Sequence, residues 1–500
     1  MWMALIGLFV PAGGQCLQVD YDIQGRVKTL FTLRDDDGLK NSAYDDMRGA
    51  GWRNELQFDV TGNLAYEGEP IVKIEKFCLS YRGAYDAIFD LRDHRYENIQ
   101  SHQSDDYEPG CRDIETENDL REVFIDFTGD FGETRAVLRL GRQIVRWGEA
   151  AFFNMMNVVC PMDVSRASPF AMPEDLETPL YMARLNYSIL DVGLLYSLDV
   201  ELLAVPDIRP MLQPPLNAEG GGVNFDAPYA FTFSDFSAFP GMTGIREDVP
   251  GTGWDNMEYG GKLTAQVGYF QGSIHYVAHF QDAPAADFSE YWNASFSGSA
   301  GPVSLRHPRQ RTYGFTFNNY IPQIDIITRG EAVCTDKEWI NDKTDFIAVS
   351  PAFGGKGFSW IAEHKSYQYL LGIDKDWKHL PIGTLSGLST AIEFYWKHFS
   401  SLEDDYSDIG VFGNRRDQQL ITFDIRTDYW SGRIKPGISL QYDPEGIWWS
   451  LVGVKYQKAR TWWCSVNQMT FWGNESASNK WAAYNMLTKT DIFFEFGIQF

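Results

Sequence analysis

Beyond its first residues, the sequence has no long apolar segment. No later run approaches the roughly 20 apolar residues that a membrane-spanning helix needs, and the mean hydropathy is −0.30. Basic residues are also scarce, because 43 Lys and Arg stand against 68 Asp and Glu, a formal charge of −25. A protein that binds nucleic acid needs a basic surface to neutralise phosphates. The composition therefore excludes a multi-span helical membrane protein and argues against a nucleic-acid partner.

Cysteine and histidine are few, with 6 and 8 residues in the chain. The cysteines form no C-x-x-C pair and match no zinc or haem spacing. The sequence contains no nucleophile elbow, H-E-x-x-H motif or P-loop. We therefore expect no catalytic residues, no metal site and no cofactor. The enzymatic alternative is a barrel phospholipase built on Ser273, His275 and His279, which share one predicted hairpin.

Aromatic residues and glycine are abundant. Phe, Trp and Tyr make up 15% of the chain, and there are 45 Gly. So many aromatics are poorly compatible with intrinsic disorder. An acidic, aromatic-rich and Gly-rich chain of modest hydropathy is typical of a bacterial outer-membrane barrel, because only alternate residues of each strand face lipid.

The dominant sequence pattern has a period of two. Apolar and polar residues alternate along 19–34, 51–65, 417–430 and 433–442, which is typical of half-buried strands. These segments exceed the usual ~5–6 residues of a soluble strand and have the length that crosses a bilayer when tilted. The predicted strands are 19–34, 51–65, 70–84, 119–128, 135–145, 179–189, 192–205, 256–270, 272–281, 309–320, 324–334, 358–374, 384–399, 417–430, 433–442, 447–458, 463–471 and 487–500.

The connections between these strands are sorted by length. Long ones lie near 35–50, 85–118, 146–178, 206–255, 282–308, 335–357, 400–416 and 472–486, and those between them are short. Outer-membrane barrels have long extracellular loops and short periplasmic turns. We predict an all-β fold: a transmembrane antiparallel up-and-down β-barrel of about 18 strands, with 16 as the alternative. Residues 15–500 form its single domain, and both termini are periplasmic.

The two ends of the chain carry targeting signals in this interpretation. Residues 1–14 are apolar and end in small residues, with Ala12 and Gly14 at the −3 and −1 positions of a secretory signal, although they have no basic start. A plain apolar terminus is the alternative. The last strand alternates and stops at an aromatic residue, which resembles the signal read by the barrel-assembly machinery, through Phe496, Ile498 and Phe500.

The stretch from 137 to about 215 carries a family resemblance. It contains L-G-R-Q-x-x-x-W-G-E from Leu140 to Glu149, an Asn157, Pro161 and Asp163 turn, and Glu177-Thr178-Pro179 before a strand. It resembles the porin-like outer-membrane family catalogued as domain-of-unknown-function family 1302. That family tends to have Asn where this chain has Cys160. The resemblance implies an outer-membrane barrel of undefined transport role, whose members work beside envelope efflux or lipid-handling proteins.

Two long connections are candidates for narrowing the pore. The segment 146–178 is rich in residues suited to a folded-in loop, although a surface loop tied by its own side chains is equally compatible. The segment 206–255 is rich in aromatics that could plug the barrel mouth or pack on one another. The constriction candidates are Arg146, Trp147, Glu149, Asn154, Asn157 and Asp163.

Charged residues on inward-facing strand positions would set selectivity. The excess of acid favours cations or neutral solutes. The two neighbouring outer loops also offer a disulfide between Cys111 and Cys160, which an oxidising compartment permits. The pore-lining candidates are Asp22, Arg26, Asp59, Arg142, Gln143, Asp424, Arg426 and Glu495.

These patterns favour a porin-like channel that passes small or apolar solutes across the outer membrane. The alternative is a barrel that sheathes or docks a periplasmic lipid-transfer or electron-transfer protein. Expected partners are outer-membrane lipid and lipopolysaccharide, the latter through cations held by acidic loop runs such as Asp35-Asp36-Asp37. Such runs are also compatible with ordinary solvated loops.

Overall fold

The computed structural model describes most strands of the chain and parts of their connections. The described residues are 17–35, 48–66, 72–91, 99–100, 115–132, 134–151, 153, 155–163, 176–212, 216–217, 242–287, 289–290, 299, 301–342, 360–378, 380, 382–383, 387–402, 416–444, 446–458, 461–473 and 490–500. The predicted signal segment 1–14 and the aromatic run 225–239 lie outside them.

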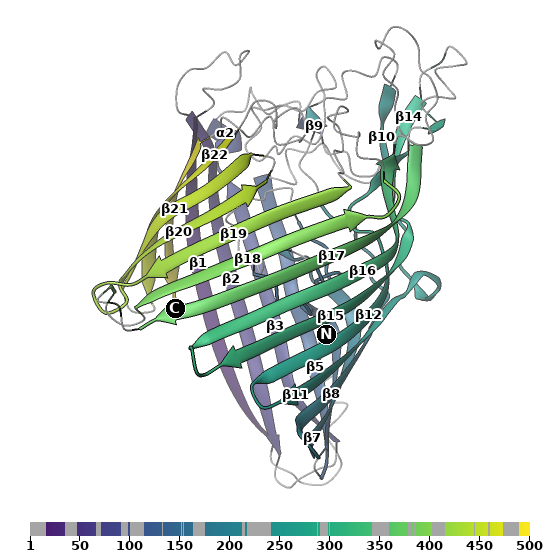
Figure 1. Cartoon of the computed structure of the whole chain (residues 1–500), viewed down its shortest axis with the longest axis vertical. Coiled ribbons are helices and arrows are strands. Elements are labelled where there is room, and N and C mark those ends of the chain that lie inside the picture. The colour runs from purple at the N-terminus through teal and green to yellow at the C-terminus, as the bar shows by residue number, and fades with distance from the viewer. Residues whose placement is uncertain are drawn as a thin grey trace.

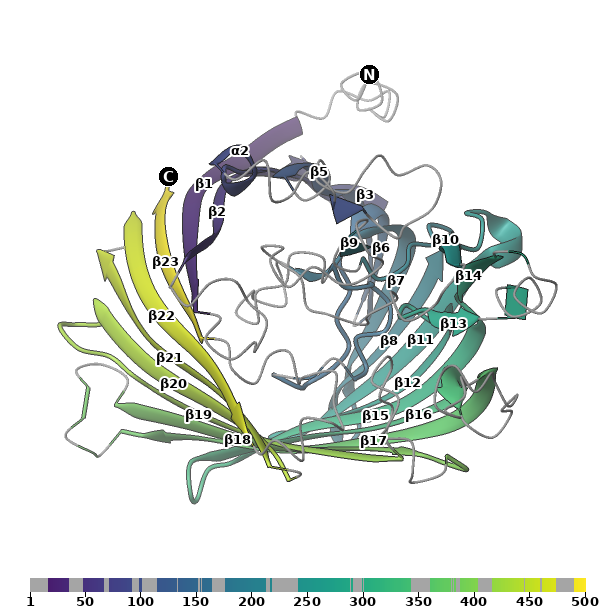
Figure 2. The same ribbon diagram turned by 90° about the horizontal axis from the view of Figure 1, so that it is seen from above.

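An 18-stranded antiparallel sheet forms the molecule, and it closes on itself (Figure 2). Each strand pairs with the next one in chain order, and β23 pairs with β1 from Arg26↔Gln499 to Asp35↔Thr490. The strands are β1 (Leu17–Asp35), β2 (Arg48–Tyr66), β3 (Val72–Asp86), β5 (Thr116–Phe131), β6 (Thr134–Gln143), β7 (Leu180–Val192), β8 (Leu195–Val205), β11 (Glu258–Val267), β12 (Phe270–Phe280), β15 (Arg309–Ile321), β16 (Ile326–Asp342), β17 (Trp360–Trp377), β18 (Leu388–Phe399), β19 (Asp417–Thr427), β20 (Ile434–Asp443), β21 (Ile447–Lys458), β22 (Trp462–Gly473) and β23 (Thr490–Gln499). The predicted barrel of about 18 strands is confirmed.

The two faces of the barrel wall differ in chemistry. In β23, Phe494, Phe496 and Ile498 are 41–43% exposed on the outside, whereas Phe493 and Glu495 point inward. The same alternation leaves large apolar side chains exposed on the outer face of many strands, and polar ones such as Glu55, Arg82 and Asp424 are buried inside. An apolar exterior around a polar interior is expected where lipid surrounds the barrel. Among the described residues, no helix is long and apolar enough to cross a membrane.

Strand boundaries agree with the alternation except where the register shifts. The strand predicted to end at residue 334 continues to Asp342 in β16. A bulge between Thr335 and Glu338 interrupts the period of two, and this interruption explains the early predicted end. The long connections lie at one end of the barrel, as predicted. One connection at that end is short, since only residues 444–446 separate β20 from β21.

Small elements lie at the long-loop end, above the barrel rim (Figure 1). β10 (Met242–Asp248) pairs in parallel with β14 (Gly301–Arg306), and β13 (Ala285–Asp287) pairs with β14. His307 Nε2 lies 3.0 Å from Glu247 Oε1, both side chains buried, and thereby ties this sheet to the start of β15. This small sheet was not among the predicted strands. The remaining small elements are α2 (Ile88–Leu91), η2 (Trp254–Asn256), and β4 (Ile99–Gln100) paired with β9 (Leu216–Asn217).

Candidate functional site

The chain between β6 and β7 enters the barrel interior. We call residues 144–163 the inner segment. Its described residues contact the inner faces of β8, β12, β15, β16 and β18, which form one continuous arc of the wall. The opposite arc, from β20 through β23 to β3, carries a separate group of charged side chains.

Two buried carboxylates fasten the inner segment to the wall. Glu331 of β16 accepts backbone N–H bonds from Glu149, from Ala150 at 2.6 Å and from Met156 at 3.2 Å. Glu393 of β18 accepts the N–H of Ala151 at 2.9 Å. Hydrogen bonds to an ionised acceptor are roughly twice as strong as neutral ones, so these contacts hold the segment in one position.

A partly buried arginine belongs to the same attachment. Arg329 of β16 lies 3.0 Å from both Glu393 and Asp374, and it donates to the backbone carbonyl of Glu149 at 3.3 Å. The carboxylates of the anchor are thus paired with donors rather than left as isolated buried charges, which would be costly.

Apolar packing completes the attachment. Trp147 is 1% exposed, and its indole N–H donates to Glu201 Oε1 at 2.7 Å. Phe153 stacks on Tyr395 with ring centroids 4.6 Å apart. Gly314 permits the close approach of Met156, whose Sδ would lie 2.3 Å from a Cβ at that position. The buried cluster comprises Val145, Trp147, Met155, Met156, Val159, Cys160, Leu180, Met182, Leu203, Val205, Val277, Val333, Leu370 and Tyr395.

The predicted constriction residues take defined places in this segment. Asn157 Oδ1 accepts the N–H groups of Trp147 and Gly148, both at 2.8 Å, and closes the turn between them. Arg146 Nε lies 2.5 Å from Glu177 Oε2. Asp163 donates its N–H to Leu176 O at 2.7 Å. Asn154 lies outside the described residues.

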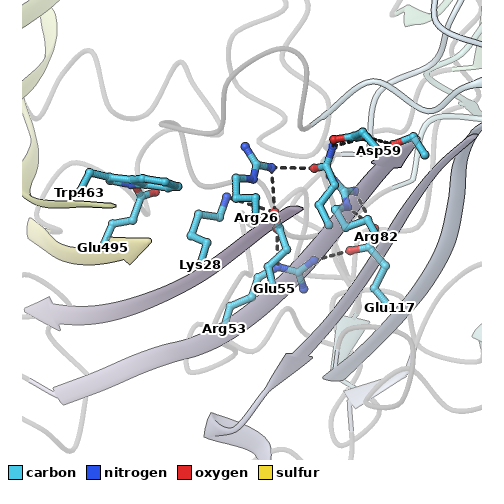
Figure 3. A network of polar contacts seen from close by, with 11 residues as sticks. Arg26, Lys28, Arg53, Glu55, Asp59, Arg82, Glu117, Trp463 and Glu495 are labelled. Carbon is cyan, nitrogen blue, oxygen red and sulfur yellow. Dashed lines mark hydrogen bonds and ion pairs between the residues drawn. The ribbon is translucent and has the colours of Figure 1, made fainter. Parts of the chain in front are cut away.

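Across the lumen, a ladder of ion pairs follows β1, β2, β3 and β5 (Figure 3). Glu55 lies 3.0 Å from Arg26 and 3.6 Å from Lys28, with Arg53 at 4.0 Å. Glu117 pairs with Arg53 and with Arg82, the latter at 2.6 Å. Each carboxylate is therefore shared between two or three cations.

The ladder continues across the closing strands. Lys455 of β21 lies over the Trp463 ring at 5.0 Å, and the Trp463 indole donates to Glu495. Lys435 donates to Gln457 at 3.2 Å. Lys455 interacts electrostatically with Glu495, Lys435, Lys28 and Arg26. We call this group the basic strip: Arg26, Lys28, Arg53, Arg82, Lys435 and Lys455, which outnumber the carboxylates Glu55, Asp59, Glu117 and Glu495.

The predicted pore-lining residues divide into two groups. The strand alternation places Asp22, Arg26, Asp59, Asp424, Arg426 and Glu495 on the inner face. Asp59 accepts a bond from Ser80, and Asp424 lies 2.7 Å from Arg426.

Arg142 and Gln143 form the second group, and both side chains are buried. Gln143 is 0% exposed beneath the inner segment, where the Cys160 thiol contacts its carbonyl. Arg142 is opposite the outward-facing Tyr181, and it is buried against Asp119 at 2.9 Å and the carbonyl of Pro179. The positive φ of Gly141 interrupts the strand alternation at this point, and both side chains are buried.

Several residues that anchor the inner segment or belong to the basic strip were not among the predicted site residues. Glu331, Glu393, Lys28, Arg53, Arg82, Lys435 and Lys455 all lie on inward-facing strand positions. The two-residue spacing from Arg26 to Lys28 was the available signal for the strip. No local signal marks Glu331, because its partners are far away in the sequence.

The structure also bears on the expected disulfide and on the enzymatic alternative. Cys160 is a free, buried cysteine, so the expected bridge to Cys111 is not formed there, and Cys111 lies outside the described residues. Burial raises the pKa of the Cys160 thiol to about 12. Ser273 contacts Thr264 at 2.9 Å, whereas His275 and His279 contact Thr316 and Thr312. Serine and histidine therefore do not form a nucleophile and base pair. No metal-binding cluster occurs in the part of the chain that the structure describes.

Comparisons with known proteins identify a family and several similar folds. A family model described as "Protein of unknown function (DUF1302)" matches residues 11–493. The chain is similar to OccAB3 from Acinetobacter baumannii, at 10% identity and a TM-score of 0.46, over 96% of this chain and 99% of that one. It is also similar to OccAB1 from the same organism, at 10% sequence identity and a TM-score of 0.47, over 96% of each chain. It is similar as well to Pseudomonas aeruginosa OpdK with vanillate, at 7% sequence identity and a TM-score of 0.44, over 96% of this chain and 98% of that one. No curated protein matches the sequence.

Proposed function

This chain belongs to the DUF1302 family of proteins of unknown function, and we propose that it forms a porin-like channel for small solutes in the bacterial outer membrane. The short turns and both chain ends lie on the periplasmic side in this proposal, and the long connections face outward. The outer face of apolar side chains supports a location in lipid.

The observation that carries the proposal is the asymmetric interior. A barrel of this strand number has a lumen wider than its own wall side chains can fill. The inner segment occupies the side along β8 to β18. The opposite side carries the charged groups of the basic strip. A passage bounded by the inner segment on one side and the basic strip on the other would carry water and polar solutes.

We further propose that the channel favours anions. The charge of the whole chain led to an expectation of cations or neutral solutes, but a permeating ion is most sensitive to charges within a few ångströms. In the basic strip the cations outnumber the carboxylates, and Glu55 is shared among Arg26, Lys28 and Arg53. The inward Asp20 and Asp22 lie farther along β1, toward its short-turn end.

Planar-bilayer recording tests the proposal. The purified, folded barrel should give discrete current steps, and its reversal potential in a KCl gradient should have the sign of chloride selectivity. Folding is verified independently by the different migration of heated and unheated samples in SDS gels. A correctly folded sample without conductance contradicts the channel, and a cation-selective current contradicts the proposed selectivity alone.

A further inference from the structure

Among the described residues, the pairing of β1 with β23 covers less of β1 than its pairing with β2. β1 pairs with β2 from Leu17 to Arg34, but it pairs with β23 only from Arg26 onward. Gly25 and Phe500 exchange both backbone bonds, at 2.8 and 2.9 Å, and the described pairing of β1 with β23 does not extend toward Leu17 beyond this point. Among the described residues, no strand pairs with the β23-facing side of Leu17–Gln24. We call these residues the open edge.

Strand geometry identifies the backbone groups that the open edge presents. The N–H and C=O of one residue point to the same neighbouring strand, and the next residue points to the other one. Gly25 directs both groups toward β23. Val19, Tyr21 and Ile23 have the same parity, so their N–H and C=O groups point away from β2 and are available for a further strand.

The side chains along this edge form two distinct rows. Val19, Tyr21 and Ile23 are exposed apolar groups on the outer face, with Tyr21 at 71%. Asp20 and Asp22 are exposed on the inner face. They accept bonds only from the neighbouring Gln18 and Gln24, at 3.2 and 2.7 Å, and β2 places Asn63 and Thr61 opposite them. The inner row is therefore acidic, with no cation opposite it on β2.

We propose that the open edge binds an extended segment of another protein by strand addition, and that this segment alternates basic and apolar residues. An exposed strand edge is a template for such pairing. Apolar residues of the added strand would lie beside Val19, Tyr21 and Ile23, and basic residues beside Asp20 and Asp22, because cross-strand neighbours of opposite charge stabilise a sheet. The placement of this partner in the periplasm rests on the proposed function, whereas the pairing itself does not.

A second copy of this chain fits the edge poorly. Antiparallel pairing of two open edges around a two-fold axis would put Asp20 opposite Asp20 or Asp22 of the other copy in the registers with substantial overlap. Like charges directly opposite each other destabilise a sheet. Charge complementarity therefore favours a basic partner segment over self-association.

Peptide binding to the purified barrel in detergent tests the inference. The probe is a fluorescent peptide of alternating Lys and Val, and its matched controls carry Glu in place of Lys or N-methyl groups along one edge. Fluorescence anisotropy should show at least tenfold tighter binding of the Lys–Val peptide than of either control. Equal binding of all three peptides would overturn the inference.

Variants of the barrel separate edge pairing from general attraction to an acidic protein. Tyr21→Pro removes one free-side donor and leaves the ladder to β2 intact, and it should weaken binding at least tenfold, whereas Tyr21→Phe should not. Asp20→Lys/Asp22→Lys leaves the backbone unchanged and should reverse the preference toward the Glu peptide. The matched reversal Asp255→Lys/Glu290→Lys, at exposed sites elsewhere, should not. Unchanged binding by the Asp20→Lys/Asp22→Lys variant would overturn the inference even if Tyr21→Pro fails to fold. Because no current is measured, a non-conducting barrel that binds the peptide contradicts the channel and supports the open edge.

Discussion

At the residue scale, a few inward carboxylates decide where the inner segment lies. Glu331 accepts N–H groups from Glu149, Ala150 and Met156. These donors have no strand partner, so without this carboxylate they would be buried and unsatisfied. An unmade buried hydrogen bond costs more than a made one contributes. A single side chain therefore controls the position of a long piece of backbone.

Glu331→Gln should loosen the inner segment. The amide retains one acceptor but loses the charge, and we expect the barrel to be less stable by about 2 kcal/mol, within the usual range for a bond to a charged group. Single-channel conductance should rise or fluctuate between levels, because the segment no longer has one fixed position. Urea unfolding and bilayer recording measure the two effects.

The matched control is Glu363→Gln. Glu363 pairs with Lys337 at 3.4 Å, and both side chains are more than half exposed. Exposed pairs contribute little, so stability and conductance should stay as in the parent. If Glu331→Gln behaves like this control, the segment is not held as described.

Lys28→Glu/Lys455→Glu should invert the selectivity of the channel. Both lysines belong to the basic strip and lie within electrostatic reach of each other. Reversing them makes the local charge negative, so the ratio of chloride to potassium permeability should fall severalfold. The reversal potential in a KCl gradient measures this ratio. Lys378→Glu, at an exposed pair with Asp325 at the short-turn end, should leave it unchanged.

Residue positions could be predicted only where the strand alternation is regular. Asp22, Arg26 and Glu495 are on inward-facing positions, because β1 and β23 alternate regularly around these residues. Arg142 and Gln143 follow Gly141, whose φ of +134° places the backbone outside the strand region. This glycine interrupts the alternation, and the chain leaves the sheet after Gln143, so the period of two does not say which of these side chains meet water.

At the element scale, the inner segment shows what composition can and cannot predict. Its Asn, Asp and Pro residues indicated a folded-in loop, and the structure places the described part inside the barrel. The strands that receive it could not be predicted. Glu149 and Glu331 are separated by 182 residues, and only the closure of the barrel brings them together.

Trp147→Ala should detach the apolar part of this element. Removal of a fully buried Trp typically costs about 3–5 kcal/mol, and here the Glu201 carboxylate also loses its 2.7 Å donor. We expect a large loss of unfolding free energy and a larger unitary conductance. Trp430→Ala is the comparison, because Trp430 is exposed at a short turn and its loss should have little effect. Equal effects of the two substitutions would contradict the packing role.

The last strand gives a second prediction at this scale. Phe500 exchanges backbone bonds with Gly25, and its ring covers the glycine, where a Cβ would lie 2.3 Å away. Deletion of Phe500 should remove the final closing bonds and the terminal aromatic, and it should lower the amount of assembled barrel severalfold. Phe500→Ala keeps the backbone bonds and should have an intermediate effect. The heat-modifiable band in outer-membrane fractions measures assembly. Normal assembly of the variant that lacks Phe500 would mean that this residue is needed neither to close the barrel nor as an assembly signal.

At the scale of the whole molecule, the architecture was predictable because lipid and water impose one rule on every strand. The strands of the barrel keep the period of two except at bulges such as the one between Thr335 and Glu338. Their connections alternate in length with the short 444–446 exception. The sheet of β10, β13 and β14 follows no such rule. Its strands are short, partly parallel and drawn from two different loops, so no local period marks them.

Because the chain is acidic as a whole but the basic strip is cationic, the selectivity of the channel should depend on the salt concentration. The formal charge is −25, but a permeating ion in the lumen passes close to Lys28, Lys435 and Lys455. The Debye length is about 10 Å at 0.1 M salt and about 3 Å at 1 M. Raising KCl over this range should therefore bring the chloride preference toward the ratio in bulk solution. In the Lys28→Glu/Lys455→Glu variant, the same increase in KCl should raise the ratio of chloride to potassium permeability toward the bulk ratio. A cation preference that grows as salt is lowered in the parent would mean that the distant acidic charges dominate permeation and that the basic strip does not.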